Sequence, residues 1–138
     1  IQTWDINSID HEVKAIAAVP LAVRASLSPD GKYMSVGNAF GPLSIFDTQT
    51  GEPEARVADS IGPTRVARFN PEGTLYASGG YDGMIRLWDA TTHKLVTEWE
   101  AYEPFSEENI GAFWPGIWDV EFSPDGKLLA TTASYSTN

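Results

Sequence analysis

The amino-acid sequence repeats with a period of 42 residues, and this repeat restricts the possible folds more than any other feature. An aromatic residue followed by aspartate occurs three times at that spacing, at Trp4, Phe46 and Trp88. A second marker is a Pro-Asp-Gly or Pro-Glu-Gly turn preceded by Ser or Asn, and it starts at Ser28, Asn70 and Ser123. Its spacings are 42 and 53, so 11 additional residues lie before the last turn. A fixed period of this length indicates stacked copies of one supersecondary unit.

Within one period the pattern predicts β-strands throughout. In each turn Pro presets φ and Gly accepts a positive φ. Short runs precede the turns at 23–27, 65–69 and 118–122, and follow them at 33–36, 75–78 and 128–131. Residues 81–83 read Tyr-Asp-Gly, a hairpin signal, residues 84–88 alternate as a half-buried strand does, and 94–99 predict a fourth strand. Four antiparallel strands joined by hairpins in about 42 residues are typical of one β-propeller blade.

The strands are expected in the order two, four, four, two along the chain. Residues 1–5 and 12–17 predict a third and a fourth strand, two complete sets follow, and the sequence ends after a second strand. We therefore expect an all-β segment of about three blades' worth of strands. Propellers close with about 4–8 blades, so this chain is not expected to close a ring alone. It is either a portion of a longer propeller, which we favour, or a unit that associates with copies of itself. The expected parts are 1–19 (end of a blade), 20–60 (blade), 61–100 (blade), 101–117 (acidic aromatic insertion loop) and 118–138 (start of a further blade).

Residues 69–89 resemble a nearly complete WD repeat, and residues 122–131 resemble the first half of another. The resemblance to the WD-repeat (WD40) β-propeller family covers nearly the whole chain, although the repeats are divergent. It implies a buried hydrogen-bond chain, the structural tetrad of Trp, Ser or Thr, His and Asp. In the central repeat Trp88, Ser78 and Asp82 match this pattern, whereas the His position falls near Ser60. In the preceding repeat Val36, Phe40 and Phe46 occupy the Ser, Asp and Trp positions, so apolar packing is expected there instead.

Composition excludes several classes of function. The chain has 9 Lys and Arg against 19 Asp and Glu, a formal net charge of −10, which argues against a basic face for nucleic acid or anionic membrane. There are no cysteines, so thiol catalysis and zinc–thiolate sites are excluded while either redox compartment remains compatible. The two histidines, His11 and His93, form no cluster, and His93 is expected to be a turn residue. No serine lies in a Gly-x-Ser-x-Gly context, so neither a catalytic residue nor a cofactor is expected.

The segment from Glu98 to Trp118 differs from the rest of the repeat. It contains the additional 11 residues, and eight acidic residues but no Lys or Arg lie between positions 95 and 126. It reads either as a solvated loop whose aromatic residues pack on their own blade or as a recognition loop. Insertions in repeat proteins are often on the binding face, and aromatic residues are enriched at interface hot spots. The predicted contact residues are Tyr102, Phe105, Phe113 and Trp114 as anchors, Glu103, Glu107 and Glu108 as steering charges, and Tyr81 on the same face. A calcium site is weighed and disfavoured because the regular Asp-x-Asp spacing is missing.

The predicted function is that of a non-catalytic protein–protein interaction scaffold, a subunit or portion of a multiprotein assembly. Its partners are expected to be other proteins, with a basic segment favoured at the acidic loop, and no nucleic acid or membrane insertion is expected. An intracellular, cytoplasmic location is expected. Two alternatives remain. One is a propeller-type hydrolase or lactonase, which also uses Ser-Pro-Asp-Gly-like turns, and the other is a propeller sensor domain attached to a larger enzyme.

Overall fold

The computed structural model describes residues 1–4, 13–15, 19–57, 63–102 and 116–134, and these residues form strands and turns without a helix. The strands are β1 (Gln2–Trp4), β2 (Val13–Ala15), β3 (Ala22–Leu27), β4 (Tyr33–Asn38), β5 (Leu43–Asp47), β6 (Pro53–Val57), β7 (Thr64–Phe69), β8 (Leu75–Gly80), β9 (Met84–Asp89), β10 (Leu95–Glu100), β11 (Gly116–Phe122) and β12 (Leu129–Ser134). No helix among the described residues could cross a bilayer.

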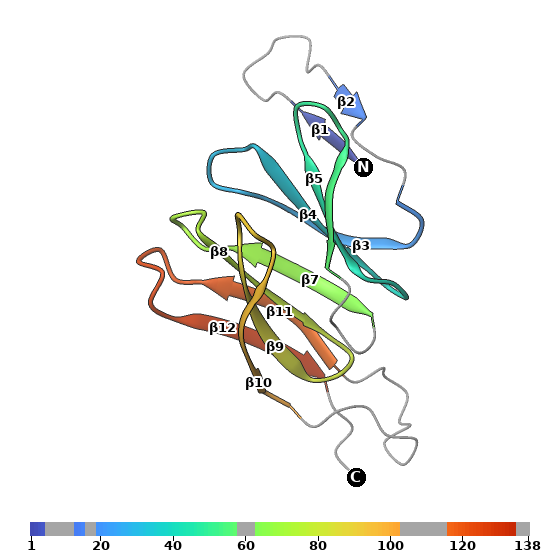
Figure 1. Cartoon of the computed structure of the whole chain (residues 1–138). Coiled ribbons are helices and arrows are strands. Elements are labelled where there is room, and N and C mark those ends of the chain that lie inside the picture. The colour runs from blue at the N-terminus through green and yellow to red at the C-terminus, as the bar shows by residue number, and fades with distance from the viewer. Residues whose placement is uncertain (5–12, 16–18, 58–62, 103–115, 135–138) are drawn as a thin grey trace.

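The strands form four antiparallel sheets that follow one another in sequence order. They comprise β1–β2, β3–β4–β5–β6, β7–β8–β9–β10 and β11–β12, which confirms the all-β fold class and, over the residues that the structure describes, the expected strand order of two, four, four, two. The first strands of the last three sheets lie side by side, since β7 contacts both β3 and β11 (Figure 1). This arrangement is that of consecutive propeller blades, with β3, β7 and β11 as their inner strands.

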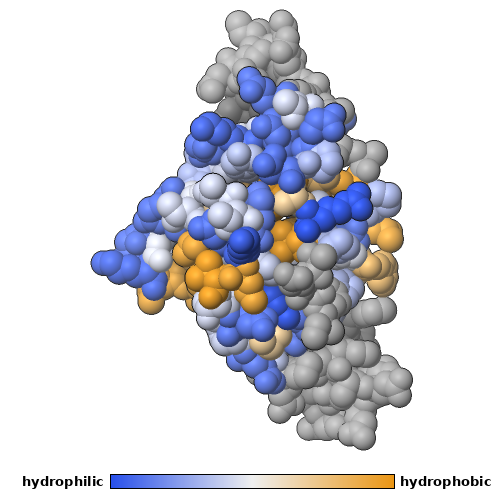
Figure 2. All heavy atoms as spheres, viewed as in Figure 1, coloured by the Kyte–Doolittle hydropathy of each residue, from blue (hydrophilic) through white to orange (hydrophobic). Residues whose placement is uncertain are grey.

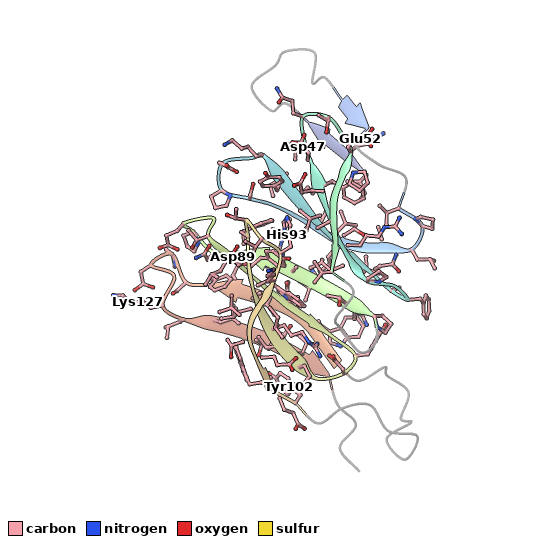
Figure 3. All side chains as sticks on the ribbon, in the orientation of Figure 1. Asp47, Glu52, Asp89, His93, Tyr102 and Lys127 are labelled. Carbon is pink, nitrogen blue, oxygen red and sulfur yellow. The ribbon has the colours of Figure 1, made fainter. Side chains whose placement is uncertain are left out.

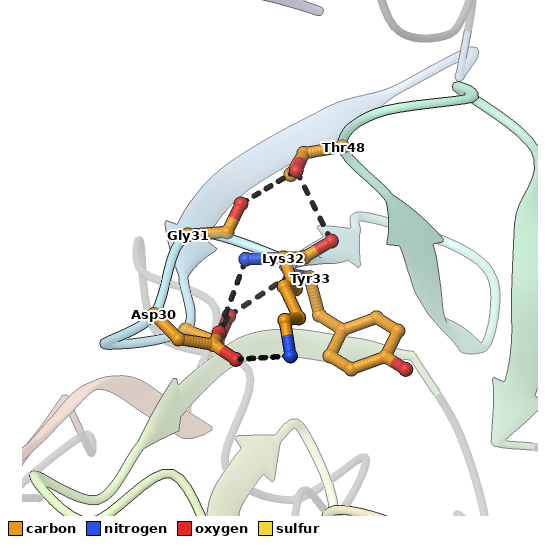
Figure 4. Close-up of polar contacts among 6 residues, drawn as sticks. Asp30, Gly31, Lys32, Tyr33 and Thr48 are labelled. Atoms are coloured by element: carbon orange, nitrogen blue, oxygen red, sulfur yellow. Dashed lines mark hydrogen bonds and ion pairs between the residues drawn. The ribbon is translucent and has the colours of Figure 1, made fainter.

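The repeated turns are stabilised by their own polar side chains. The Ser28 hydroxyl donates to the Asp30 carboxylate at 2.7 Å and accepts the Tyr33 amide at 2.9 Å. The Asp30 carboxylate also accepts the Lys32 amide at 3.1 Å (Figure 4). These bonds to Ser28 and to the backbone lower the pKa of Asp30. Gly31 closes the turn with φ of 73°. Ser123 and Asp125 repeat the arrangement, with hydrogen bonds of 2.6 Å and 2.9 Å at the equivalent atoms, so the recurring carboxylates serve the turns.

Apolar clusters join neighbouring blades. The largest lies between the two four-stranded sheets and contains Leu43 and Ile45 from one, and Phe69, Tyr76 and Trp88 from the other. The second joins the central sheet to β11. A third cluster contains Met34, Val36 and Phe46. Each large side chain buried in this way contributes about 1.5–3 kcal/mol, so these contacts hold the blades in a fixed relation.

Two glycines at equivalent positions set how closely consecutive blades approach. A Cβ atom on Gly37 in β4 would overlap the backbone carbonyl of Arg65 in β7. A Cβ atom on Gly79 in β8 would lie 2.6 Å from Cγ2 of Ile117 in β11. In each pair, the inner strand of the next blade therefore packs directly against the backbone of the previous blade, which only glycine permits.

Candidate protein-interaction surface

Each inner strand contains one β-bulge, and the three bulges occupy equivalent positions. The register shifts between Ala22 and Arg24 in β3, between Thr64 and Val66 in β7, and between Ile117 and Asp119 in β11. The bulged residues are therefore Val23, Arg65 and Trp118. A bulge turns a side chain away from the direction that regular pairing would give it. Three such residues consequently gather at the end of the molecule where β3, β7 and β11 begin.

Arg65 is held between two aromatic side chains at this end. Its guanidinium carbon lies 3.5 Å from the ring centroid of Trp118 and 4.9 Å from that of Tyr81. Its Nη1 donates a hydrogen bond of 2.9 Å to the Tyr81 hydroxyl. Burial lowers the pKa of Arg65 from its ordinary value, and the nearby positive charge of Arg24 lowers it further. The guanidinium is thus fixed in position by one hydrogen bond and two cation–π contacts.

A row of ion pairs links the three inner strands. Arg24 of β3 lies 3.3 Å from the Asp119 carboxylate of β11. Arg68 of β7 lies 3.5 Å from Asp119 and 3.4 Å from Glu121. The side chains are a quarter to three quarters exposed, so each pair contributes about 0–1 kcal/mol. Arg24 and Arg68 are therefore paired with carboxylates, whereas none of these ion pairs includes Arg65.

Two of the eight predicted contact residues lie in described parts of the chain. Tyr102 packs against the cluster around Ile117, and its hydroxyl lies 3.0 Å from Oγ1 of Thr131. Figure 3 places it at the end of the sheets opposite the Lys127 turn. Tyr81 is half-buried beside Arg65. The other six lie outside the described residues, and their role stays a prediction: Phe105, Phe113, Trp114, Glu103, Glu107 and Glu108.

Of the residues predicted for the tetrad, Trp88 and Ser78 are brought together, whereas Asp82 has other partners. The Trp88 indole Nε1 donates to the Ser78 hydroxyl at 2.8 Å, and both side chains are buried. Asp82 instead accepts the Met84 amide at 3.2 Å and pairs with Nη1 of Arg86 at 2.6 Å. Ser60, which was expected near the missing His position, lies outside the described residues.

Arg86 is the polar residue that sequence reasoning missed in this blade. It is 5% exposed although charged. Besides Asp82 it faces Glu98 of β10, whose carboxylate lies 2.9 Å from the Arg86 Nε. That contact is an ion pair without hydrogen-bond alignment, since Nε has no hydrogen-bond partner. The strand register places Arg86 opposite Glu98, and Asp82 lies four residues before it in the turn that leads into β9.

Among the described residues, His93 lies in a turn and contacts Tyr76. His93 has a positive φ of 55°, so the prediction that it is a turn residue is confirmed. Its Nδ1 lies 3.5 Å from the hydroxyl of Tyr76, and burial raises the pKa of that phenol. His11 lies outside the described residues. Among the residues that the structure covers, no three His, Asp or Glu side chains gather as a metal site would require.

Comparison with known proteins supports the interpretation of the repeats. Residues 58–89 and 111–137 match the family described as WD40, the WD domain with G-beta repeat. Serine-threonine kinase receptor-associated protein of Gallus gallus is 36% identical over 102 residues, which cover 74% of this chain and 29% of that protein. Eukaryotic translation initiation factor 3 subunit I of Phaeosphaeria nodorum is 35% identical over 91 residues, which cover 65% of this chain and 24% of that protein. Apoptotic protease-activating factor 1 of Homo sapiens is 25% identical over 135 residues, which cover 98% of this chain and 11% of that protein.

The chain thus spans less than a third of the length of these relatives. Three findings agree nevertheless: the 42-residue period, the consecutive four-stranded antiparallel blades and the matched repeats. The chain belongs to the WD-repeat β-propeller family.

Proposed function

We propose that this chain is a non-catalytic scaffold that binds other proteins as part of a multiprotein assembly inside the cell. The observation that supports this most is the rigid connection of its blades, which holds the ends of three inner strands in one place. Apolar clusters and the close approach at Gly37 and Gly79 join neighbouring sheets. A partner that docks on such a surface meets side chains that are already ordered, so little conformational entropy is lost on binding.

The relatives support this proposal through what their names state. One is described as receptor-associated, and another as a subunit of an initiation factor. The turn residues also support it, because Ser28 and Ser123 already hydrogen-bond to Asp30 and Asp125. These hydroxyls and carboxylates stabilise turns, which is a structural role that accounts for their recurrence in the repeat.

Native size analysis tests this proposal. The protein that contains this chain should elute from a native extract of its source in a species larger than its own mass, and mass spectrometry should identify the same additional proteins in independent preparations. Elution as a lone monomer would contradict the assembly role. A panel of ester and lactone substrates, assayed with and without divalent cations, tests the alternative of a propeller hydrolase. Turnover that disappears in a variant of this chain would overturn the non-catalytic assignment.

A further inference from the structure

We propose that the end of the molecule where β3, β7 and β11 begin binds a protein segment that presents a carboxylate beside an apolar side chain. Arg65 binds the carboxylate, and Val23 and its apolar neighbours contact the adjacent side chain. This inference rests on the scaffold function proposed above and specifies the chemistry of the partner.

The first argument is the local balance of charge. Three guanidinium groups, those of Arg24, Arg65 and Arg68, lie along the inner strands. Two carboxylates, those of Asp119 and Glu121, are paired with Arg24 and Arg68. Arg65 contacts two aromatic rings and one hydroxyl, and no carboxylate of the described residues pairs with it. Within the described part of the chain, one positive charge at this end therefore has no carboxylate paired with it.

The second argument is that Arg65 is already oriented before any partner arrives. Stacking on Trp118 and the hydrogen bond to Tyr81 fix its plane, and the bulge in β7 fixes its backbone. A guanidinium held in this way retains N–H groups that can donate to a carboxylate in a two-bond arrangement. Arg, Trp and Tyr are also the residue types that dominate the binding energy of protein interfaces.

The third argument is the apolar surface beside this charge. Leu21, Val23 and Phe40 are 61%, 41% and 64% exposed, so three large apolar residues of one blade are open to solvent. They belong to the start of β3 and to the turn after β4, and Figure 2 shows hydrophobic atoms at this edge of the molecule. That turn touches β7, because the Gly41 carbonyl accepts the Thr64 amide at 3.3 Å. The turn that carries Phe40 is thus bonded to the residue before Arg65, which places the apolar residues and Arg65 at the same end of the inner strands.

The net charge of the chain sets how such a partner associates. With a formal charge of −10 the chain repels an acidic segment at long range, whereas the contact with Arg65 is short-ranged. Salt at physiological strength screens charges beyond about 8 Å. The association rate of an acidic partner should therefore rise with added salt, the opposite of what a basic partner would show.

Fluorescence polarisation with a synthetic probe tests the proposal on the full protein. The probe is a short labelled peptide with a single glutamate between two phenylalanines, and its control has glutamine in place of the glutamate. Arg65→Gln should weaken binding of the glutamate peptide by about tenfold or more, and Arg65→Lys should weaken it less, because the charge remains while the planar stack is lost. Lys94→Gln is the control, since Lys94 is an exposed cation in the turn between β9 and β10, at the opposite end of the strands.

Thermal melting of each variant separates lost binding from lost folding. If Arg65→Gln melts early, Tyr81→Phe replaces it, because this change removes only the hydroxyl that orients the guanidinium and should weaken binding a few-fold. The proposal is overturned by the absence of saturable binding, by equal binding of the glutamine peptide, or by an equal effect of Lys94→Gln. Native assemblies that persist in Arg65→Gln alongside such a result would refute this surface while leaving the scaffold function intact.

Discussion

A double-mutant cycle should show that Trp88 and Ser78 are energetically coupled through the hydrogen bond between them. The indole Nε1 donates to the Ser78 hydroxyl at 2.8 Å, with the two residues 1% and 2% exposed. Ser78→Ala removes the acceptor and leaves a buried N–H without a partner. Such a group costs about 1–3 kcal/mol, so the free energy of unfolding should fall by that amount.

Replacement of Trp88 by phenylalanine changes the expected effect of Ser78→Ala on the free energy of unfolding. Trp88→Phe removes the donor and part of the ring, and we expect it to cost about 2–4 kcal/mol from lost packing and the stranded hydroxyl. On that background Ser78→Ala removes an unsatisfied hydroxyl, so its cost should be close to zero or reversed. The coupling free energy between the two changes should consequently be about 1–3 kcal/mol.

Urea denaturation of the four proteins, followed by far-UV circular dichroism, measures this coupling. Ser123→Ala on the Trp88→Phe background serves as the additive control, because Ser123 stabilises a turn in a different sheet. Changes at distant sites add within about 0.3–0.5 kcal/mol. A coupling between Ser78 and Trp88 within that error would refute the reasoning, since the bond would then contribute nothing beyond the separate side chains.

Three further outcomes are expected. Gly37→Ala should lower the melting temperature through overpacking of about 1–3 kcal/mol, because its Cβ would meet the Arg65 carbonyl; an unchanged melting temperature would show that the blades can separate without cost. Arg86→Ala should lower the free energy of unfolding by about 3 kcal/mol, far more than Arg24→Ala, because it leaves a largely buried carboxylate unpaired; equal effects in urea denaturation would contradict this. Burial raises the pKa of Tyr76, so the neutral phenol stabilises the fold below the unfolded-state pKa of about 10 and this contribution falls as the pH rises above it. Tyr76→Phe should flatten the loss of stability in an alkaline denaturation series, and an equally steep loss would refute that role.

The strands can be predicted well from the sequence because the sequence signals for each blade are local. Pro-Asp-Gly turns, the Tyr-Asp-Gly hairpin and alternating strands act over a few residues, and the structure has strands at each of these places. The contact between Trp88 and Ser78 is also found from the sequence, because the family resemblance supplies the pair. The partner of Asp82 could not be found in this way. Arg86 follows Asp82 by four residues and pairs with it at the start of β9, whereas it meets Glu98 only through the register of β9 with β10.

The surface around Arg65 is hidden from sequence analysis for a different reason. A bulge is a property of a pair of strands, and nothing in residues 64–66 alone marks it. The aromatic contacts of Arg65 come from Tyr81, in the turn after β8, and from Trp118 in the next blade. The available signal was the repeat itself, because Val23, Arg65 and Trp118 take the same place in successive inner strands while differing in chemistry. A position that varies among otherwise similar repeats suggests a side chain released from packing constraints.

The close backbone contacts at Gly37 and Gly79 have a consequence for how such a chain tolerates sequence change. A β-carbon at either position would overlap an atom of the next blade, the Arg65 carbonyl or the Ile117 side chain. The spacing between successive blades is therefore set where the glycine backbone meets the next inner strand. Interior side chains can then differ from blade to blade without altering the curvature of the ring, as the Trp88–Ser78 pair and the Phe46–Val36 pair already do. Mutational drift in the core should therefore change the stability of individual blades while the spacing of the exposed rim residues persists, so that binding specificity and core composition can evolve separately.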